Sequence, residues 1–201
     1  LGPYGREWWG EQFSGDPGKQ LSQTFTFNTG PLTSPVTFNI ATGSRGPGAK
    51  NIFVVSVNSV PLGVDTLGSA GQGEDDYAVA EVIKNWSTTV SSTTSNVNIT
   101  YQPNGYGNIG YLNYIELNYR RALQFTDAQI SFRDWRSVGA GKVAQYQLQG
   151  ATSATQVWDV TDPQNAVRMA GTLTGSIYTF AQDASRLHEF AALNSEDVYI
   201  P

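Results

Sequence analysis

Histidine, cysteine and clustered carboxylates supply most enzyme chemistry, and this chain of 201 residues is poor in them. It has one histidine, His188, and no cysteine. A Ser–His–Asp or Cys–His hydrolase needs a base beside its nucleophile, and a zinc site needs several histidine or cysteine ligands. The sequence therefore predicts no catalytic residue and no metal ligand set. An ordinary surface or hydrogen-bonded role is expected for His188.

Carboxylates gather at two places in the chain. Glu74, Asp75 and Asp76 lie in a Gly-rich stretch, where oxygen ligands could hold calcium, but the EF-hand spacing is missing. We expect these three acids to be solvated and no cofactor to be bound. Asp159 and Asp162 form a second pair, and the Asp-Pro step at Asp162 favours a turn in which that side chain caps backbone N–H groups.

One cluster of cations and aromatic residues has a spacing that could serve binding. It consists of Arg120, Arg121, Arg133, Asp134, Trp135 and Arg136. The first interpretation is a structural role, in which Arg136 pairs with Asp134 across a turn at a strand end. The second is a binding role, in which a neighbouring domain docks on Arg133, Trp135 and Arg136, since tryptophan and arginine dominate the binding energy of many interfaces.

Strands with period-two alternation must position these residues. Phe25 and Phe27 alternate with threonine, for example, as in a sheet with one buried face. The pattern predicts a β-sandwich or jelly roll of about eleven short strands, near residues 24–28, 36–40, 52–57, 77–83, 97–101, 111–123, 130–132, 144–148, 157–160, 169–173, 177–180 and 187–193. Residues 63–76 are expected to be loop, and a single helical turn is expected near 183–187.

Composition limits the partners and the organisation. The net charge is −5 and only 14% of residues are charged, so no basic field exists for nucleic acid. No apolar run reaches the length of a membrane span. We expect a lead-in segment, residues 1–20, followed by one β-sandwich domain, residues 21–201. Trp8 and Trp9 in the lead-in are expected to pack on the sandwich, or alternatively to form an exposed aromatic platform.

Five motif segments follow one another along the chain, namely GREWWGEQF (5–13), GYLNYIELNYRR (110–121), FRDWRSVG (132–139), QVWDVTDP (156–163) and LHEFAAL (187–193). Together they resemble the region ahead of the peptidase domain in gingipain-type cysteine peptidases, above all the sortase of the bacterial type IX secretion system. One departure is His188, which stands where the family has an arginine. Six residues of these motifs are expected to be structural, namely Arg120, Arg121, Asp134, Trp158, Asp159 and Asp162.

The resemblance implies a β-sandwich lying before a caspase-like peptidase domain in a larger, exported protein of the bacterial cell surface or outer membrane. In the sortase branch, such a protein removes C-terminal sorting domains from cargo and helps attach the cargo to surface lipopolysaccharide. The catalytic histidine and cysteine belong to the later domain, so none is carried onto this chain. The implied partners are the chain's own downstream peptidase domain and, beyond it, secreted cargo or secretion-system components.

Three functions are compatible with these features of the sequence. The favoured one is a non-catalytic accessory domain of a gingipain-like surface peptidase, in which only the full-length parent is an enzyme. The alternative is a carbohydrate-binding jelly-roll module that uses tryptophans, including Trp86, as a stacking platform. A free-standing hydrolase that uses carboxylates alone ranks last, because nothing in the sequence selects a pair among its seventeen acids.

Overall fold

The computed structural model describes residues 9–46, 50–68, 80–105, 107–125 and 128–195. These residues form fifteen β-strands and one turn of 3₁₀ helix, and no helix among them is long and apolar enough to cross a membrane. The fold is therefore all-β, as predicted. The chain divides into two compact units, Leu1–Ala122 (unit 1) and Leu123–Pro201 (unit 2), and each has its own core.

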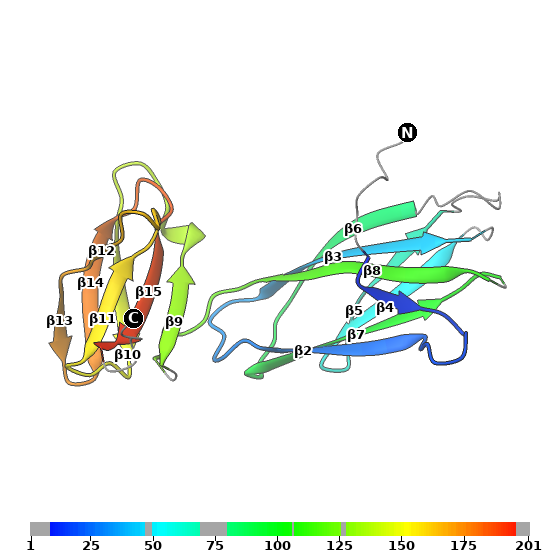
Figure 1. Ribbon diagram of the computed structural model, residues 1–201, viewed down its shortest axis with the longest axis horizontal. Helices are drawn as coiled ribbons and strands as arrows, with labels where there is room; N and C mark the ends of the chain where they lie inside the picture. Colours follow the sequence, from blue (N-terminus) through cyan, green and yellow to red (C-terminus); the bar gives the residue numbers. More distant parts are fainter. Residues whose placement is uncertain (1–8, 47–49, 69–79, 106, 126–127, 196–201) are drawn as a thin grey trace. The chain divides into compact units, whose positions relative to one another are not determined.

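Unit 1 is a sandwich of two four-stranded antiparallel sheets (Figure 1). One sheet has the order β1-β8-β3-β6 and the other the order β2-β7-β4-β5, which is the strand order of an eight-stranded jelly roll. The strand bounds are Glu11–Phe13 for β1, Ser22–Asn28 for β2, Val36–Arg45 for β3, Asn51–Val57 for β4, Val60–Leu67 for β5, Ala80–Thr88 for β6, Thr94–Gln102 for β7 and Ile109–Asn118 for β8.

Alternating apolar side chains from both sheets meet in the core of unit 1. Strand β4 shows the pattern clearly, because Phe53, Val55 and Val57 are buried while the residues between them are partly exposed. The Phe53 ring lies 4.8 Å from the Tyr101 ring. Gly110 lies on the facing sheet against these rings. A Cβ at this position would lie 2.7 Å from Phe53 and 2.8 Å from Tyr101, so the close approach requires glycine.

Unit 2 is a smaller antiparallel sandwich. A sheet of order β10-β14-β13 faces a sheet of order β12-β11-β15-β9. Its elements are β9 (Gln129–Arg133), the 3₁₀ turn η1 (Trp135–Ser137), β10 (Val143–Gln149), β11 (Thr155–Asp159), β12 (Val167–Arg168), β13 (Gly171–Thr174), β14 (Ile177–Asp183) and β15 (Glu189–Asn194).

Aromatic rings fill the core of unit 2. Phe132 stacks on Phe190 at 5.3 Å within one sheet, and Tyr146 stacks on Phe180 at 5.1 Å within the other. Phe180 and Phe190 then meet edge to face across the two layers at 5.2 Å. Offset and edge-to-face pairs of this kind stabilise a core beyond the apolar area that they bury.

The division into two units differs from the single domain expected over residues 21–201. Alternation of period two continues on both sides of Ala122, so the sequence pattern holds no mark of the boundary. The lead-in expected over residues 1–20 also differs in part, because Glu11–Phe13 forms β1 and pairs with β8. Phe13 is fully buried and belongs to the core of unit 1.

Strand β5 overlaps the loop that was expected over residues 63–76. The strand contains Pro61 and Gly63, but it pairs with β4 with a shift of register at this point, and bulges tolerate both residue types. Trp86 of β6 lies directly on Gly63, where a Cβ would come 2.2 Å from the indole Nε1. The helical turn expected near 183–187 is absent, and a 3₁₀ turn forms at Trp135–Ser137 instead.

Candidate functional site

Three of the five motif segments meet at one end of the four-stranded sheet of unit 2. Arg133 ends β9 and lies opposite Glu189, the first residue of β15, and their side chains form an ion pair at 2.5 Å. The backbone N–H of Val160 donates to the Glu189 carbonyl at 2.8 Å. The Glu189 N–H in turn donates to the Thr161 hydroxyl at 3.0 Å. Segments far apart in sequence are thereby joined by direct hydrogen bonds.

A pair formed by a buried histidine and a partly buried aspartate lies within this group. His188 Nδ1 lies 2.6 Å from Asp159 Oδ2, and only 7% of the histidine side chain is exposed. The imidazole is parallel to the Phe190 ring, with the centroids 6.2 Å apart. Gln182 of β14 places its amide nitrogen 3.5 Å from the same carboxylate oxygen. The pair thus links the two sheets of unit 2.

Hydrogen bonds set the electrostatics of both aspartates in this motif. Burial alone would raise the pKa of Asp159, but hydrogen bonds from Thr161 and from His188 outweigh it and hold that pKa below its ordinary value. Asp162 accepts from the amide of Asn165 at 2.8 Å and from the backbone N–H of Gln164 at 3.0 Å. These bonds also lower the pKa of Asp162. Asp159 therefore stays ionised at neutral pH.

The arginine and tryptophan segment forms the exposed face of the same strand end. Asp134 is the N-cap of η1, and its carboxylate accepts from the backbone N–H of Arg136 at 3.1 Å. The expected link between these two residues is therefore made through the main chain. Trp135 is 63% exposed, and Arg136 is exposed beside it. Asp134 fixes the turn that presents both side chains to solvent.

The other arginines of the predicted cluster lie in unit 1, before the division between the units. Arg121 forms an isolated bridge with Leu32, and the Arg120 carbonyl accepts from the Thr33 N–H at 2.9 Å. They belong to the end of the jelly roll, not to the strand end of unit 2. Trp158 of β11 is partly buried and donates to Gln156 at 3.3 Å.

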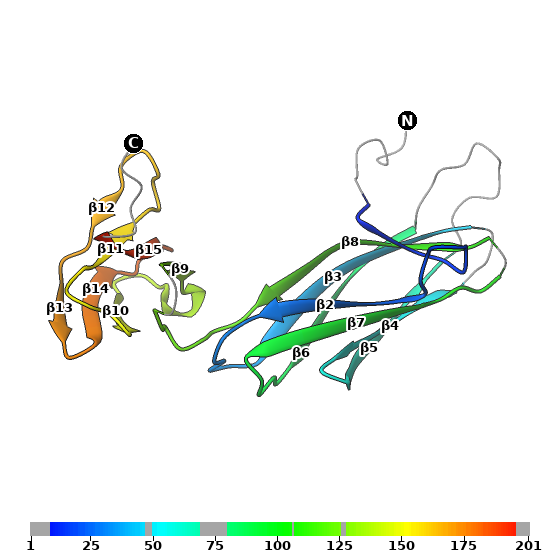
Figure 2. The same cartoon turned by 60° about the horizontal axis from the view of Figure 1, so that its bottom comes forward.

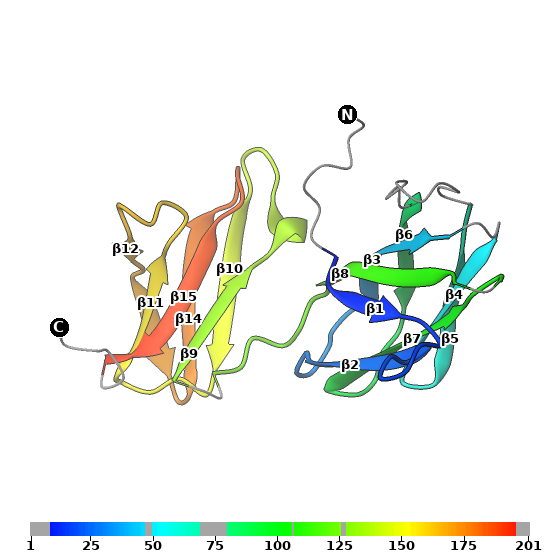
Figure 3. The same cartoon turned by 45° about the vertical axis from the view of Figure 1, so that its right-hand side comes forward.

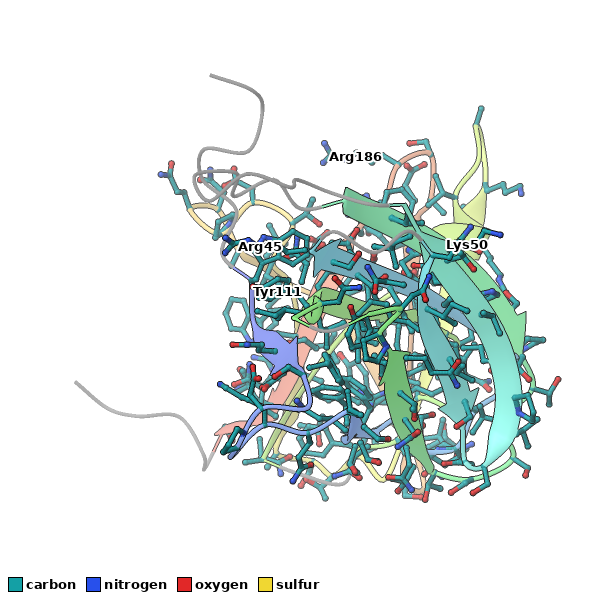
Figure 4. All side chains as sticks on the ribbon, turned by 90° about the vertical axis from the view of Figure 1, so that its right-hand side faces the viewer. Arg45, Lys50, Tyr111 and Arg186 are labelled. Carbon is teal, nitrogen blue, oxygen red and sulfur yellow. The ribbon has the colours of Figure 1, made fainter. Side chains whose placement is uncertain are left out.

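The remaining two motif segments meet in unit 1, where β1 pairs with the start of β8 (Figure 3). Trp9, just before β1, packs on Tyr111 with the ring centroids 5.8 Å apart. Figure 4 labels Tyr111 near the blue ribbon of β1. Trp8 and the acidic stretch Glu74–Asp76, for which calcium was considered, lie outside the described residues. Within the described ranges, no three acidic or histidine side chains are grouped as a metal site.

A second concentration of buried polar atoms lies inside unit 1. The Thr42 hydroxyl of β3 donates to Asp65 Oδ2 of β5 at 2.6 Å, across the sandwich, and both residues are 1% exposed. The other carboxylate oxygen, Oδ1, has no hydrogen-bond partner. Burial raises the pKa of Asp65, while Thr42 and the charge of Lys84 oppose that rise.

Sequence reasoning did not predict that Asp159 and Asp65 each form part of a hydrogen-bond network between strands. His188 and Asp159 are 29 positions apart, and each was considered alone. Both residues lie in motif segments that resemble the same family, QVWDVTDP for Asp159 and LHEFAAL for His188. Segments that resemble one fold can be expected to pack together, and this was the signal that could have paired the two residues. Asp65 lay in a stretch assigned to loop, where burial was not expected. The contacts of the histidine–aspartate pair with Gln182 of the facing sheet are those of a structural link between the sheets.

No protein-family model matches the chain, and no curated protein matches it. Among solved structures, the chain is similar to the crystal structure of dimeric latent PorU from Porphyromonas gingivalis, with a TM-score of 0.79 and 18% sequence identity. The likeness covers 96% of this chain and 19% of the PorU chain. The chain thus spans about a fifth of the length of that structure, and it has the fold of that stretch.

Proposed function

We propose that this chain is a non-catalytic accessory region of a larger, exported cysteine peptidase of the type IX secretion system sortase kind. The observation that carries the proposal is the likeness to PorU, which covers 96% of the chain and therefore includes both units. Two unrelated modules would not be expected to match one stretch of a single larger protein. The parent protein carries the peptidase activity, and this chain contributes folding, positioning or recognition.

The arrangement of the motif segments supports the same proposal. The segments whose sequence resembles the gingipain-type front end are joined in pairs by strand pairing or hydrogen bonds, in unit 1 through β1 and β8 and in unit 2 through β9, β11 and β15. Shared sequence at positions that hold a fold together is what a common architecture requires. The exposed Trp135 and Arg136 then form the surface best suited to the downstream domain or to cargo.

The described tryptophans give little support to the carbohydrate-binding alternative. Trp9, Trp86 and Trp158 are partly buried, and each packs or bonds within its own unit. A stacking platform needs several exposed rings in one plane. Only Trp135 among the described tryptophans is exposed, so we do not propose this function.

The parent reading frame beyond the codon for Pro201 tests the proposal first. A caspase-like domain with a histidine and a cysteine at neighbouring strand ends is expected there. A stop codon, or an unrelated domain, would discard the proposal.

The role of the exposed strand end is tested by binding to that downstream domain. Trp135→Ser should weaken association of the two purified pieces at least tenfold, measured by isothermal titration calorimetry. Val167→Ser is the matched control, because Val167 is 60% exposed on β12, in the sheet whose strand β9 precedes the turn with Trp135. Equal losses from both variants, or none from either, would count against docking through Trp135.

A further inference from the structure

The outer edge of β2 is a long and regular strand edge with no described strand beside it. β2 stands at the end of the order β2-β7-β4-β5, and Figure 2 shows it alongside β7. Its seven residues, SQTFTFN, pair with β7 without any register shift and contain neither a charge nor a proline. Proteins usually protect such edges with lysine, proline, a bulge or a very short strand. β2 has none of these devices.

Alternation shows which backbone groups of β2 point away from β7. The Leu21 carbonyl accepts from Tyr101 at 2.7 Å, and the Thr29 N–H donates to Thr93 at 3.0 Å. Odd-numbered residues therefore direct their backbone groups toward β7 and its extensions. Because antiparallel ladders alternate, the N–H and C=O groups of Thr24, Thr26 and Asn28 point outward. The start of the strand is covered, since Gln20 forms a bridge with Phe13 of β1.

A groove runs beside this edge, between the two sheets of unit 1. Phe25 and Phe27 of β2 line one side, and Leu112 and Ile115 of β8 line the other, around a volume of about 250 Å³. An apolar cavity of about 150 Å³ is enough for a benzene ring. A strand added beside β2 would direct every second side chain into this groove, and apolar side chains would fit it.

The opposite rim of the groove is less suited to accept a strand. β1 occupies the edge of β8 only as far as Leu112, and β8 has a register shift next to Asn113. A bulge of this kind interrupts a regular ladder. Glu11 is the charged side chain among the residues that line the groove, so a neutral or basic occupant is favoured over an acidic one. These features select β2 as the receiving edge.

We propose that β2 accepts an extended segment of a partner polypeptide as an added antiparallel strand, with apolar side chains at alternate positions filling the groove. Main-chain hydrogen bonds supply affinity in this mode, and the pockets for alternate side chains supply specificity. A second copy of the chain fits less well. Its own Phe25 and Phe27 are already packed on its own core, so they cannot fill the groove of a neighbour. The inference stands on unit 1 alone and is independent of the proposed function.

The probe for the test is a synthetic peptide, Lys-Thr-Val-Thr-Val-Thr-Lys, titrated into the full chain and followed by amide hydrogen exchange with NMR detection. Binding should slow exchange at Thr24, Thr26 and Asn28, whose N–H groups point outward, and leave Phe25 and Phe27 unchanged. The same peptide N-methylated at alternate residues, on its pairing edge, should not bind. Binding of the methylated peptide with equal affinity would overturn the proposal, as would no binding of the parent peptide at millimolar concentration.

A pair of variants separates the strand edge from the side chains. Thr24→Pro removes an outward N–H without removing a bond to β7, and should weaken peptide binding at least tenfold. Thr24→Val keeps the N–H and should bind as the wild type does. Equal binding by both variants would refute the proposal. Slow exchange of the outward amides in the chain without peptide would also refute the proposal, because it would mean that the edge of β2 is already covered. Sedimentation velocity would then show whether the chain self-associates. Protection that is lost on dilution would identify a second copy as the cover, and protection that persists would identify the chain's own residues.

Discussion

Replacing the buried Thr42–Asp65 pair by two valines should leave unit 1 at least as stable as the wild type. The pair joins β3 to β5 across the core through one 2.6 Å hydrogen bond, while the second carboxylate oxygen has no partner. A buried polar pair must offset the loss of hydration of both groups. Apolar side chains of similar shape need no such compensation, and such replacements are often neutral or stabilising.

The single variants should behave differently from the double variant. Thr42→Val removes the hydroxyl that donates to a buried carboxylate, and such bonds contribute about 1.5–3 kcal/mol. Asp65→Val leaves the Thr42 hydroxyl buried without its acceptor, which offsets the gain from removing the carboxylate by about 1–3 kcal/mol. The double variant avoids both penalties. We therefore expect it to exceed Thr42→Val in stability by about 2 kcal/mol or more.

The pH dependence gives the experiment a second readout. Burial raises the pKa of Asp65, so the folded state binds a proton more tightly than the unfolded chain, whose carboxyl titrates near 3.8. Tighter proton binding by Asp65 therefore stabilises the folded wild type fully below pH 3.8. This stabilisation is lost as the pH rises through the pKa of Asp65 in the folded state. The advantage of the double variant over the wild type should therefore grow from acidic to neutral pH.

Amide hydrogen exchange in β3 and β5, measured against urea concentration, reports on unit 1 separately from unit 2. Thr42→Val, Asp65→Val, the double variant and the wild type form one thermodynamic cycle. If the double variant lost the sum of the two single losses, the two side chains would not be coupled. That result would refute the reasoning.

Three further changes test other parts of the molecule. Asp159→Asn should lower the free energy of unfolding of unit 2 by about 1–3 kcal/mol at neutral pH, measured by amide hydrogen exchange in β11. Because the pKa of Asp159 is depressed, the wild type should lose this advantage over the variant as the pH falls through that pKa, below 3.8. A persistent difference at lower pH would contradict this. Gly63→Ala should cost about 1–3 kcal/mol and change Trp86 fluorescence, because the new methyl group meets the indole; an unchanged melting temperature would be inconsistent with that contact. Arg133→Ala should cost at most about 1 kcal/mol in thermal unfolding, since the ion pair is exposed, and a larger loss would point to a role beyond pairing.

Alternation was enough to predict an all-β sandwich and the positions of most strands. It works for β2 and β4 because one face of each strand is more buried than the other, partly buried against exposed in β2 and buried against partly buried in β4. It fails for β5, where proline and glycine occur at a bulge instead of a break. It also extends β8 too far, since the strand ends at Asn118 and the following residues continue only as bridges.

Features that depend on pairing between distant segments could not be predicted from alternation, because alternation does not tell which strands pair. The two cores are separate because β9 pairs with β15 and not with any strand of unit 1, and no local signal encodes that choice. The same limit applies to the candidate site. The turn chemistry of Asp162 follows from the Asp-Pro step, whereas the pairing of Asp159 with His188 depends on how β11 and β15 lie beside each other.

The last described strand of each unit lies inside its sheet, and this has a consequence for synthesis on the ribosome. β8 lies between β1 and β3, and β15 lies between β11 and β9. A growing chain therefore cannot complete either sheet until the final strand of that unit has emerged, and earlier strands must wait with a vacant position between them. Unit 1 can close after residue 118 is released, whereas unit 2 needs residue 194. Stalled or truncated products would expose unpaired strands, which are prone to aggregate.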